Sequence, residues 1–153
     1  MPAIGEIAPD FTLQRDGGDQ VTLSALRGGP VVLFFYPRDD TSGCTTEAKD
    51  FTARLSSFQA KGAKVLGISR DSVASHEKFV AKQELGIPLL ADEDGAVTEA
   101  YGVWVEKSMY GRTYMGIERS TFLIGSDGTI REIWRKVRVK GHAQTVLDAT
   151  TAL

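Results

Sequence analysis

The sequence predicts an α/β protein in which helices cover a mixed β-sheet. Short apolar runs that indicate buried strands alternate with amphipathic stretches that indicate helices, and this alternation is typical of parallel strand pairing. Near the C-terminal end, two strand-like runs flank a Ser-Asp-Gly turn at residues 126–128, which predicts an antiparallel hairpin in the same sheet. A chain of 153 residues suits one substantial core, so we expect residues 1–153 to form a single domain.

The individual elements follow in order along the chain. Residues 1–30 predict two short strands joined as a hairpin by the turn at Asp16–Asp19, and Val31–Phe35 predicts the first long core strand. Apolar residues three and four positions apart then indicate a helix over 48–58. The remaining elements are expected as a strand at 65–69, a helix at 73–85, a short strand at 88–92, a short helix at 95–101, an ordered loop at 106–116, strands at 118–124 and 129–137, and a final helix from about His142.

The composition argues against several classes of function. The formal net charge is −2 and the basic residues are scattered, so there is no basic patch for nucleic acid. No apolar run approaches the ~20 residues of a membrane span, and the N-terminus lacks the pattern of a signal peptide. Because glycine-rich nucleotide motifs are absent, and two histidines with one cysteine make a poor metal set, we expect no cofactor.

The single cysteine lies where a strand leads into a helix. This position puts Cys44 at or near the helix N-terminus, where free N–H groups and the helix dipole favour an anion. A thiol there ionises more readily, and the thiolate is the reactive form. Pro37 fixes its own backbone and can shield the turn from water, while Thr41 lies three residues before the cysteine. One cysteine also excludes an internal disulfide and fits a reducing cytosol, so we expect a cytoplasmic protein.

The same residues also allow a purely structural interpretation. Thr41 and Ser42 would then cap the helix, Pro37 would end the strand, and Cys44 would be a small buried hydrophobe. Local chemistry alone leaves the two interpretations open.

The pattern Pro37-x-x-x-Thr41-x-x-Cys44 resembles the active-site signature of the peroxiredoxins. The wider stretch over residues 35–48 is similar to the bacterioferritin-comigratory, or Q-type, branch of that family. The resemblance implies a thioredoxin-like fold with an N-terminal β-hairpin extension and a peroxidase whose Cys44 thiolate attacks a hydroperoxide. It also implies that Thr41 helps to hold the peroxide and that Pro37 keeps the pocket dry.

Arg119 is the second candidate site residue. It begins a mostly apolar strand, so its charge needs a partner, for which Glu118 and Glu47 are the candidates, or its side chain extends to solvent. The segment from Gly111 to Ile124 resembles the Q-type segment that carries the active-site arginine, which implies that the guanidinium lies beside the thiolate and the peroxide. Glu47, three residues after the cysteine on the same helix, would orient it, although glutamate at this spacing also fits a capping box.

The chain departs from the family pattern in one important respect. Relatives that form an intramolecular disulfide carry a resolving cysteine five residues after the first one or in the following helix, but here Lys49 holds the first position and the second helix has no cysteine. The resemblance therefore implies a one-cysteine cycle through a sulfenic acid. An external thiol (thioredoxin, glutaredoxin with glutathione, or a small thiol) would recycle it, and we expect a monomer.

Two rival functions remain open from the residues. One is a cysteine hydrolase that uses His76 or His142 as its base, although both histidines are expected on the surface near helix starts. The other is a non-enzymatic, thioredoxin-like binding or redox-sensing module whose cysteine oxidises without turnover. Asp39 and Asp40, which precede the cysteine, are expected to form a solvated turn.

Overall fold

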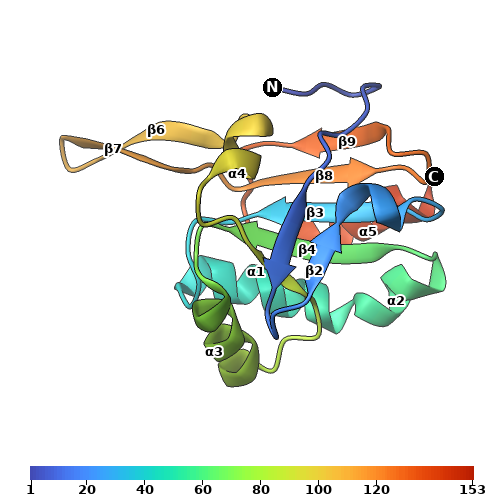
Figure 1. Cartoon of the computed structure of the whole chain (residues 1–153), viewed down its shortest axis with the longest axis horizontal. Helices are drawn as coiled ribbons and strands as arrows, with labels where there is room; N and C mark the ends of the chain where they lie inside the picture. Colours follow the sequence, from blue (N-terminus) through green and yellow to red (C-terminus); the bar gives the residue numbers. More distant parts are fainter.

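A seven-stranded mixed sheet forms the centre of the computed structural model, which describes all residues 1–153 (Figure 1). The strand order is β2-β1-β5-β4-β3-β8-β9. β3 pairs in parallel with β4 and antiparallel with β8, as expected for a thioredoxin-like sheet closed by a C-terminal hairpin. The strands of this sheet span β1 (Thr12–Arg15), β2 (Gln20–Thr22), β3 (Val31–Phe35), β4 (Lys64–Ser69), β5 (Leu89–Ala91), β8 (Ser120–Ile124) and β9 (Ile130–Trp134).

Two apolar cores lie on opposite faces of the sheet, and β3 supplies side chains to both of them. Because successive residues of a strand point to opposite faces, Val32 and Phe34 face one core while Leu33 and Phe35 face the other. The first core contains residues of α1 (Ser42–Ala53), α2 (Leu55–Ala60), α3 (Val73–Gln83) and α5 (His142–Thr151). The second contains residues of the N-terminal segment, the 3₁₀ helix at Leu23–Leu26 and α4 (Ala96–Ala100). All five residues of β3 are buried, which explains their continuous apolar sequence.

The expected helix over 48–58 is divided in the structure. It begins earlier, at Ser42, and is interrupted at Arg54, whose backbone is not helical, before α2 continues to Ala60. The apolar face was predicted correctly, since Ala48, Phe51 and Phe58 are all buried. None of the helices combines the length and the apolar character needed to cross a membrane.

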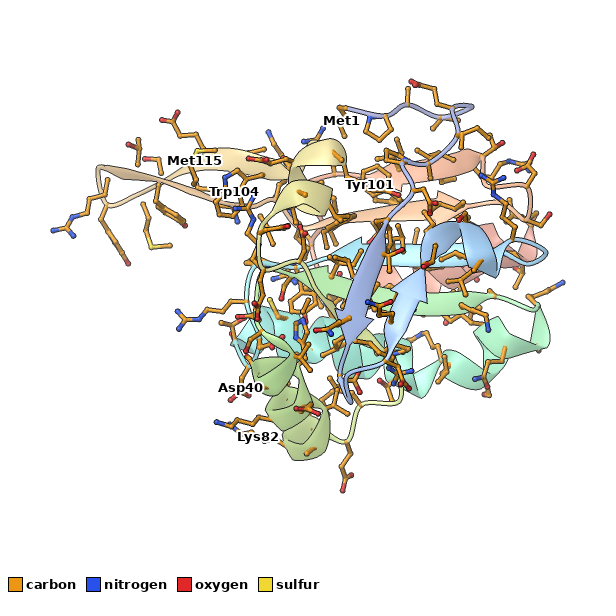
Figure 2. All side chains as sticks on the ribbon, in the orientation of Figure 1. Met1, Asp40, Lys82, Tyr101, Trp104 and Met115 are labelled. Atoms are coloured by element: carbon orange, nitrogen blue, oxygen red, sulfur yellow. The ribbon has the colours of Figure 1, made fainter.

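The expectation of an ordered loop at 106–116 is wrong. Strands β6 (Trp104–Met109) and β7 (Arg112–Ile117) form a separate two-stranded hairpin that extends away from the main sheet (Figure 1). Tyr110 and Gly111 make its turn, both with positive φ, as a tight hairpin turn requires. The sequence shows no alternation here because most of the hairpin faces solvent on both sides. Met115, for example, lies on its exposed part (Figure 2).

The core under α1 leads to a first prediction. Phe51 is fully buried, and its ring stacks on Phe34 at 4.8 Å between centroids. We expect Phe51→Ala to lower the free energy of unfolding by about 3–5 kcal/mol, because it removes that contact and leaves a cavity. Urea unfolding measures this, with Lys49→Ala on the exposed side of the same helix as the control. Equal losses in the two variants would contradict the assignment of Phe51 to the core.

Candidate active site

Cys44 lies in the first turn of α1, which begins directly after Thr41. Its side chain is 1 % exposed and belongs to the core between α1 and the sheet. The N–H groups of Ser42, Gly43 and Cys44 have no partner within the helix, because a helix leaves its first donors free. Cys44 therefore lies at the positive end of the helix, as the sequence predicts.

The guanidinium of Arg119 contacts Cys44. Nη2 donates a hydrogen bond to Cys44 Sγ at 3.3 Å, while Nη1 donates to Glu47 Oε1 at 2.8 Å. Arg119 is held near the end of β3 because the next residue, Ser120, pairs with Phe35 in the sheet. The sheet register thus brings together two residues that are 75 positions apart in the chain.

Glycine at position 43 leaves room for this arrangement. A methyl group built on Gly43 would lie 3.2 Å from Arg119 Nη2, closer than a side-chain carbon normally approaches another atom. The guanidinium can therefore reach over the first turn of the helix to the sulfur because there is no side chain in its way.

Glu47 is a buried partner of Arg119. Burial raises the pKa of Glu47 to about 7, against the opposing effect of the Arg119 charge. Its second oxygen, Oε2, is buried without a hydrogen-bond partner. Burial likewise opposes the charge of Arg119, but Glu47 and Cys44 outweigh it and raise the pKa of the guanidinium. Glu47 and Glu118 were the two predicted partners of Arg119. Arg119 forms its ion pair with Glu47, whereas Glu118 pairs with Arg135.

Thr41 and Pro37 frame the loop that leads to Cys44. Thr41 precedes α1 but makes no side-chain cap, so the alternative interpretation of its hydroxyl as a helix cap gains no support. Its Oγ1 donates to the Arg38 carbonyl oxygen at 2.9 Å, and no hydrogen bond joins it to Cys44. Pro37 is half-buried at the end of β3. The structure therefore brings Cys44, Arg119 and Glu47 into contact and leaves the Thr41 hydroxyl on the adjoining loop.

The expectation of surface histidines is wrong for both residues. His76 is fully buried, with Nδ1 2.7 Å from Asp39 Oδ2, and His142 Nε2 lies 2.7 Å from Thr121 Oγ1. Neither histidine is hydrogen-bonded to Cys44, so the hydrolase alternative gains no support. A lone histidine in an amphipathic stretch gives no sign of burial, because its partners come from distant strands and loops.

The expectation of a solvated turn at Asp39 and Asp40 is correct for Asp40 and wrong for Asp39. Asp39 is buried and accepts hydrogen bonds from Tyr36 and Ser75. Asp40 is exposed and pairs with Lys82 of α3 at 2.6 Å (Figure 2). The only signal in the sequence was the polar tyrosine at the end of an otherwise apolar strand, since a buried phenol needs a partner.

A buried cysteine at a helix N-terminus, contacted by an arginine from a neighbouring strand of a thioredoxin-like sheet, defines a site of the peroxiredoxin class. Comparison with known proteins leads to the same class. Residues 4–133 match the model of the AhpC/TSA family, and the chain belongs to this family. It is a bacterioferritin-comigratory peroxiredoxin, a thiol-dependent peroxidase with an antioxidant role.

Individual relatives cover nearly the whole chain. It is 52 % identical to Peroxiredoxin Bcp of Xanthomonas campestris over 94 % of this chain and 89 % of that protein, and 47 % identical to Peroxiredoxin Bcp of Bacillus subtilis over 95 % and 92 %. Among solved structures, a cysteine-to-serine mutant of Xylella fastidiosa PrxQ is 44 % identical, with a TM-score of 0.93 over 98 % and 96 % of the chains. Two structures of Xanthomonas campestris Peroxiredoxin Q each carry a cysteine-to-serine substitution at a different position, whereas this chain has one cysteine.

The two hydrogen bonds that the Arg119 guanidinium donates, to Cys44 and to Glu47, lead to the second prediction. Arg119→Lys keeps the positive charge but cannot donate to Cys44 and Glu47 at once in a fixed plane, so we expect the second-order rate constant with hydrogen peroxide to fall about 100-fold. Stopped-flow fluorescence measures the rate. Arg135→Lys, which alters the neighbouring ion pair with Glu118, is the matched control and should stay within a few-fold of wild type. A wild-type rate in Arg119→Lys would show that the site is misplaced.

The third prediction concerns the stability of the fold at acid pH. Burial, and after it the positive charge of Arg119, lower the pKa of His142 from its ordinary 6.5 to about 4. Between these values the unfolded chain binds a proton that the folded chain does not, so the contribution of His142 is fully present above pH 6.5 and is lost as the pH falls toward 4. His142→Gln should remove this loss, which is on the order of 2 kcal/mol.

Urea unfolding of both proteins at pH 7 and pH 4.5 measures the effect. Glu47 titrates over the same interval with the opposite sign, because its pKa is higher in the folded state, so only the difference between variant and wild type reports on His142. Identical pH dependence in the two proteins would contradict a buried, neutral His142.

Proposed function

We propose that this peroxidase reduces hydrogen peroxide and organic hydroperoxides at Cys44 through a sulfenic acid and that an external thiol restores it. The contact between Arg119 Nη2 and Cys44 Sγ, at 3.3 Å, is the observation that carries the proposal. A fixed positive charge at that distance stabilises the thiolate and supplies donors to an incoming peroxide.

The first half of the proposed cycle forms the sulfenic acid. The Cys44 thiolate attacks the distal peroxide oxygen, an S–O bond forms, and the O–O bond breaks with its electron pair going to the departing oxygen. A proton converts that oxygen to water or alcohol. Arg119, the Cys44 backbone N–H and, after reorientation toward substrate, the Thr41 hydroxyl stabilise the charge that develops on the oxygens. Pro37 shields the pocket, and Glu47 orients Arg119 through its hydrogen bond at 2.8 Å.

The second half of the cycle depends on another molecule. Since Cys44 is the only cysteine, no thiol of the same chain can condense with the sulfenic acid. An external thiol attacks the sulfur and releases water, and a second thiol breaks the mixed disulfide to regenerate Cys44. Thioredoxin, glutaredoxin with glutathione, or a small thiol would serve, and all of them are reduced in the cytoplasm, where we propose that the enzyme works.

We further propose that the protein acts as a monomer formed by one domain of residues 1–153. The two cores support a single domain, because both are built on the same strand, β3. The position of Cys44 supports a monomeric cycle, because a sulfur that is 1 % exposed is poorly placed to meet the same sulfur of a second copy.

The fourth prediction tests this one-cysteine cycle. After one equivalent of hydrogen peroxide, intact mass spectrometry should show mainly a monomer with one added oxygen that reacts with a sulfenic-acid trap, and excess peroxide should add further oxygens. Cys44→Ser is the control and should gain no trap-reactive oxygen. Non-reducing electrophoresis checks for dimers, and quantitative formation of a Cys44–Cys44 dimer would overturn the cycle. Peroxide consumption no faster than that of a free thiol would leave a redox sensor as the better interpretation.

A further inference from the structure

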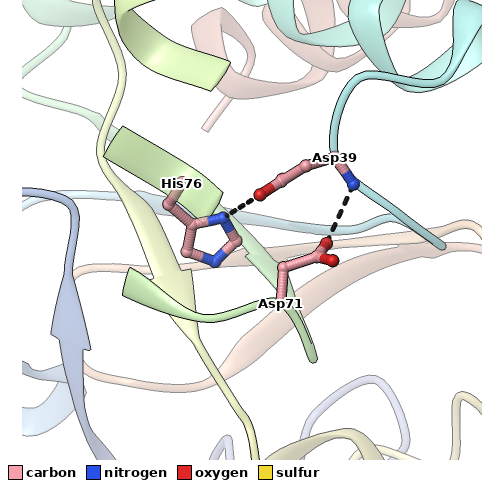
Figure 3. Close-up of side chains that lie close together, drawn as sticks. All are labelled: Asp39, Asp71 and His76. Atoms are coloured by element: carbon pink, nitrogen blue, oxygen red, sulfur yellow. Dashed lines mark hydrogen bonds and ion pairs between the residues drawn. The ribbon is translucent and has the colours of Figure 1, made fainter. Parts of the chain in front are cut away.

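A buried pair of ionisable groups lies outside the site around Cys44. His76 of α3 faces Asp39 in the loop between β3 and α1 (Figure 3). His76 Nδ1 is 2.7 Å from Asp39 Oδ2, and Nε2 is 2.9 Å from the Leu90 carbonyl oxygen of β5. The His76 side chain is fully buried, and the proposed chemistry at Cys44 does not use either residue.

The hydrogen bonds determine the protonation state of the pair. A carbonyl oxygen only accepts, so His76 Nε2 must carry a proton to donate to Leu90. The Asp39 carboxyl group accepts from Tyr36 Oη at 2.6 Å and from Ser75 Oγ at 2.8 Å, and donors of this kind stabilise a carboxylate. His76 Nδ1 must then donate to Asp39 as well. The ring is therefore an imidazolium paired with a carboxylate.

The groups that surround His76 agree with a positive charge. Asp39 faces it from the loop before α1, Asp71 lies close by after β4, and the Tyr36 phenol, just after β3, lies with its oxygen 3.4 Å from His76 Nδ1. Burial lowers the pKa of His76, but the hydrogen bond and charge of Asp39, the Leu90 carbonyl and the charge of Asp71 together raise it above the ordinary value. Asp39, Asp71 and His76 are close enough to suggest a metal site, yet both ring nitrogens are already occupied by hydrogen bonds.

This pair fixes the loop that leads into the active-site helix. Asp39 lies between Pro37 and Thr41, and its backbone N–H donates to Asp71 Oδ2 at 2.8 Å. The next residue, Asp40, has a φ of 59°, a conformation that a non-glycine residue keeps only when its surroundings hold it. The course of the chain into α1 therefore depends on the contacts of Asp39 with Ser75 and His76 of α3 and with Asp71, which follows β4.

We propose that His76 is a positioning residue of the peroxidase, which in its imidazolium form holds Asp39 and thereby the Pro37–Thr41 loop in the arrangement that receives peroxide beside Cys44. The inference rests on the proposed reaction at Cys44. When the ring loses its proton at higher pH, a nitrogen lone pair faces the Asp39 carboxylate, and the pair repels where it previously attracted. The loop is then released, and the reaction with peroxide slows.

The fifth prediction begins with the protonation state itself. Long-range ¹H–¹⁵N NMR of the wild-type protein should show both ring nitrogens of His76 protonated at pH 7, and one of them deprotonated only at a pH above 6.5, the ordinary value of histidine. A neutral His76 ring at pH 7 would overturn the inference. This measurement does not depend on catalysis, so it stands even if the reaction at Cys44 is not the one proposed.

The kinetic part of the test compares the pH dependence of the rate constant with hydrogen peroxide in the wild-type protein and in Asp39→Asn. Its amide can donate to a neutral His76 Nδ1 while its oxygen still accepts from Tyr36, so the loop stays anchored without the extra proton. We expect the wild-type rate constant with hydrogen peroxide to fall about tenfold as the pH rises through the His76 titration, and Asp39→Asn to stay within about twofold over the same range. Asp40→Asn, the same charge change at the adjacent position, should keep the wild-type fall.

A third variant removes the imidazole. His76→Gln should lower the rate constant about tenfold at pH 7, if it folds, and should show no further fall at higher pH. Identical pH profiles in wild type and Asp39→Asn would overturn the positioning role. Peroxidase activity retained in Cys44→Ser would instead reject the proposed reaction, so the two failures are distinguishable.

Discussion

The site depends on the antiparallel pairing of β3 with β8. The pairing sets Ser120 opposite Phe35, so the residue before β8 and the helix after β3 meet at one end of the sheet. A shift of one residue would turn each side chain of β8 to the other face and move Arg119 away from Cys44. Both strands are buried on both faces, so such a shift would also expose the apolar side chains of two cores. The packing of the sheet therefore fixes the geometry of the chemistry.

Arg119 is held in place before any substrate arrives. One nitrogen is bound by Glu47, which is itself buried, so the guanidinium has little freedom to turn. In the proposed reaction, preorganisation of this kind would concentrate the favourable electrostatics on the reacting atoms and avoid the cost of arranging them during the reaction. The structure carries a cost in return, since Glu47 Oε2 is buried without a partner and an unsatisfied group of this kind costs about 1–3 kcal/mol.

Much of the fold and the position of Cys44 could be predicted from the sequence, because those features are local or periodic. Apolar runs gave the buried strands, and the strand-to-helix transition located Cys44 at a helix start. Arg119 and Glu47 were suggested by the resemblance to a known family, and their contact follows from the sheet register.

The features that were missed depend on distant contacts or on the lack of burial. The environment of His76 is made by a loop and a strand far away in the chain, so nothing next to it in the sequence marks it as buried. Its neighbour Asp39 appeared to be a turn residue for the same reason. The β6–β7 hairpin was missed because most of its residues are exposed, and a strand pair of this kind leaves no alternation of apolar and polar residues.

That hairpin has a consequence for how the protein can evolve. Its base is anchored where Ile117 enters the core, but its tip, with Tyr110 97 % exposed, contributes almost nothing to the packing of the sheet. Substitutions and insertions at the tip therefore cost the fold little. Because β7 ends two residues before Arg119, the surface beside the reactive cysteine can diversify while the chemistry is preserved. The architecture thus separates the residues around Cys44 from a surface that is free to change.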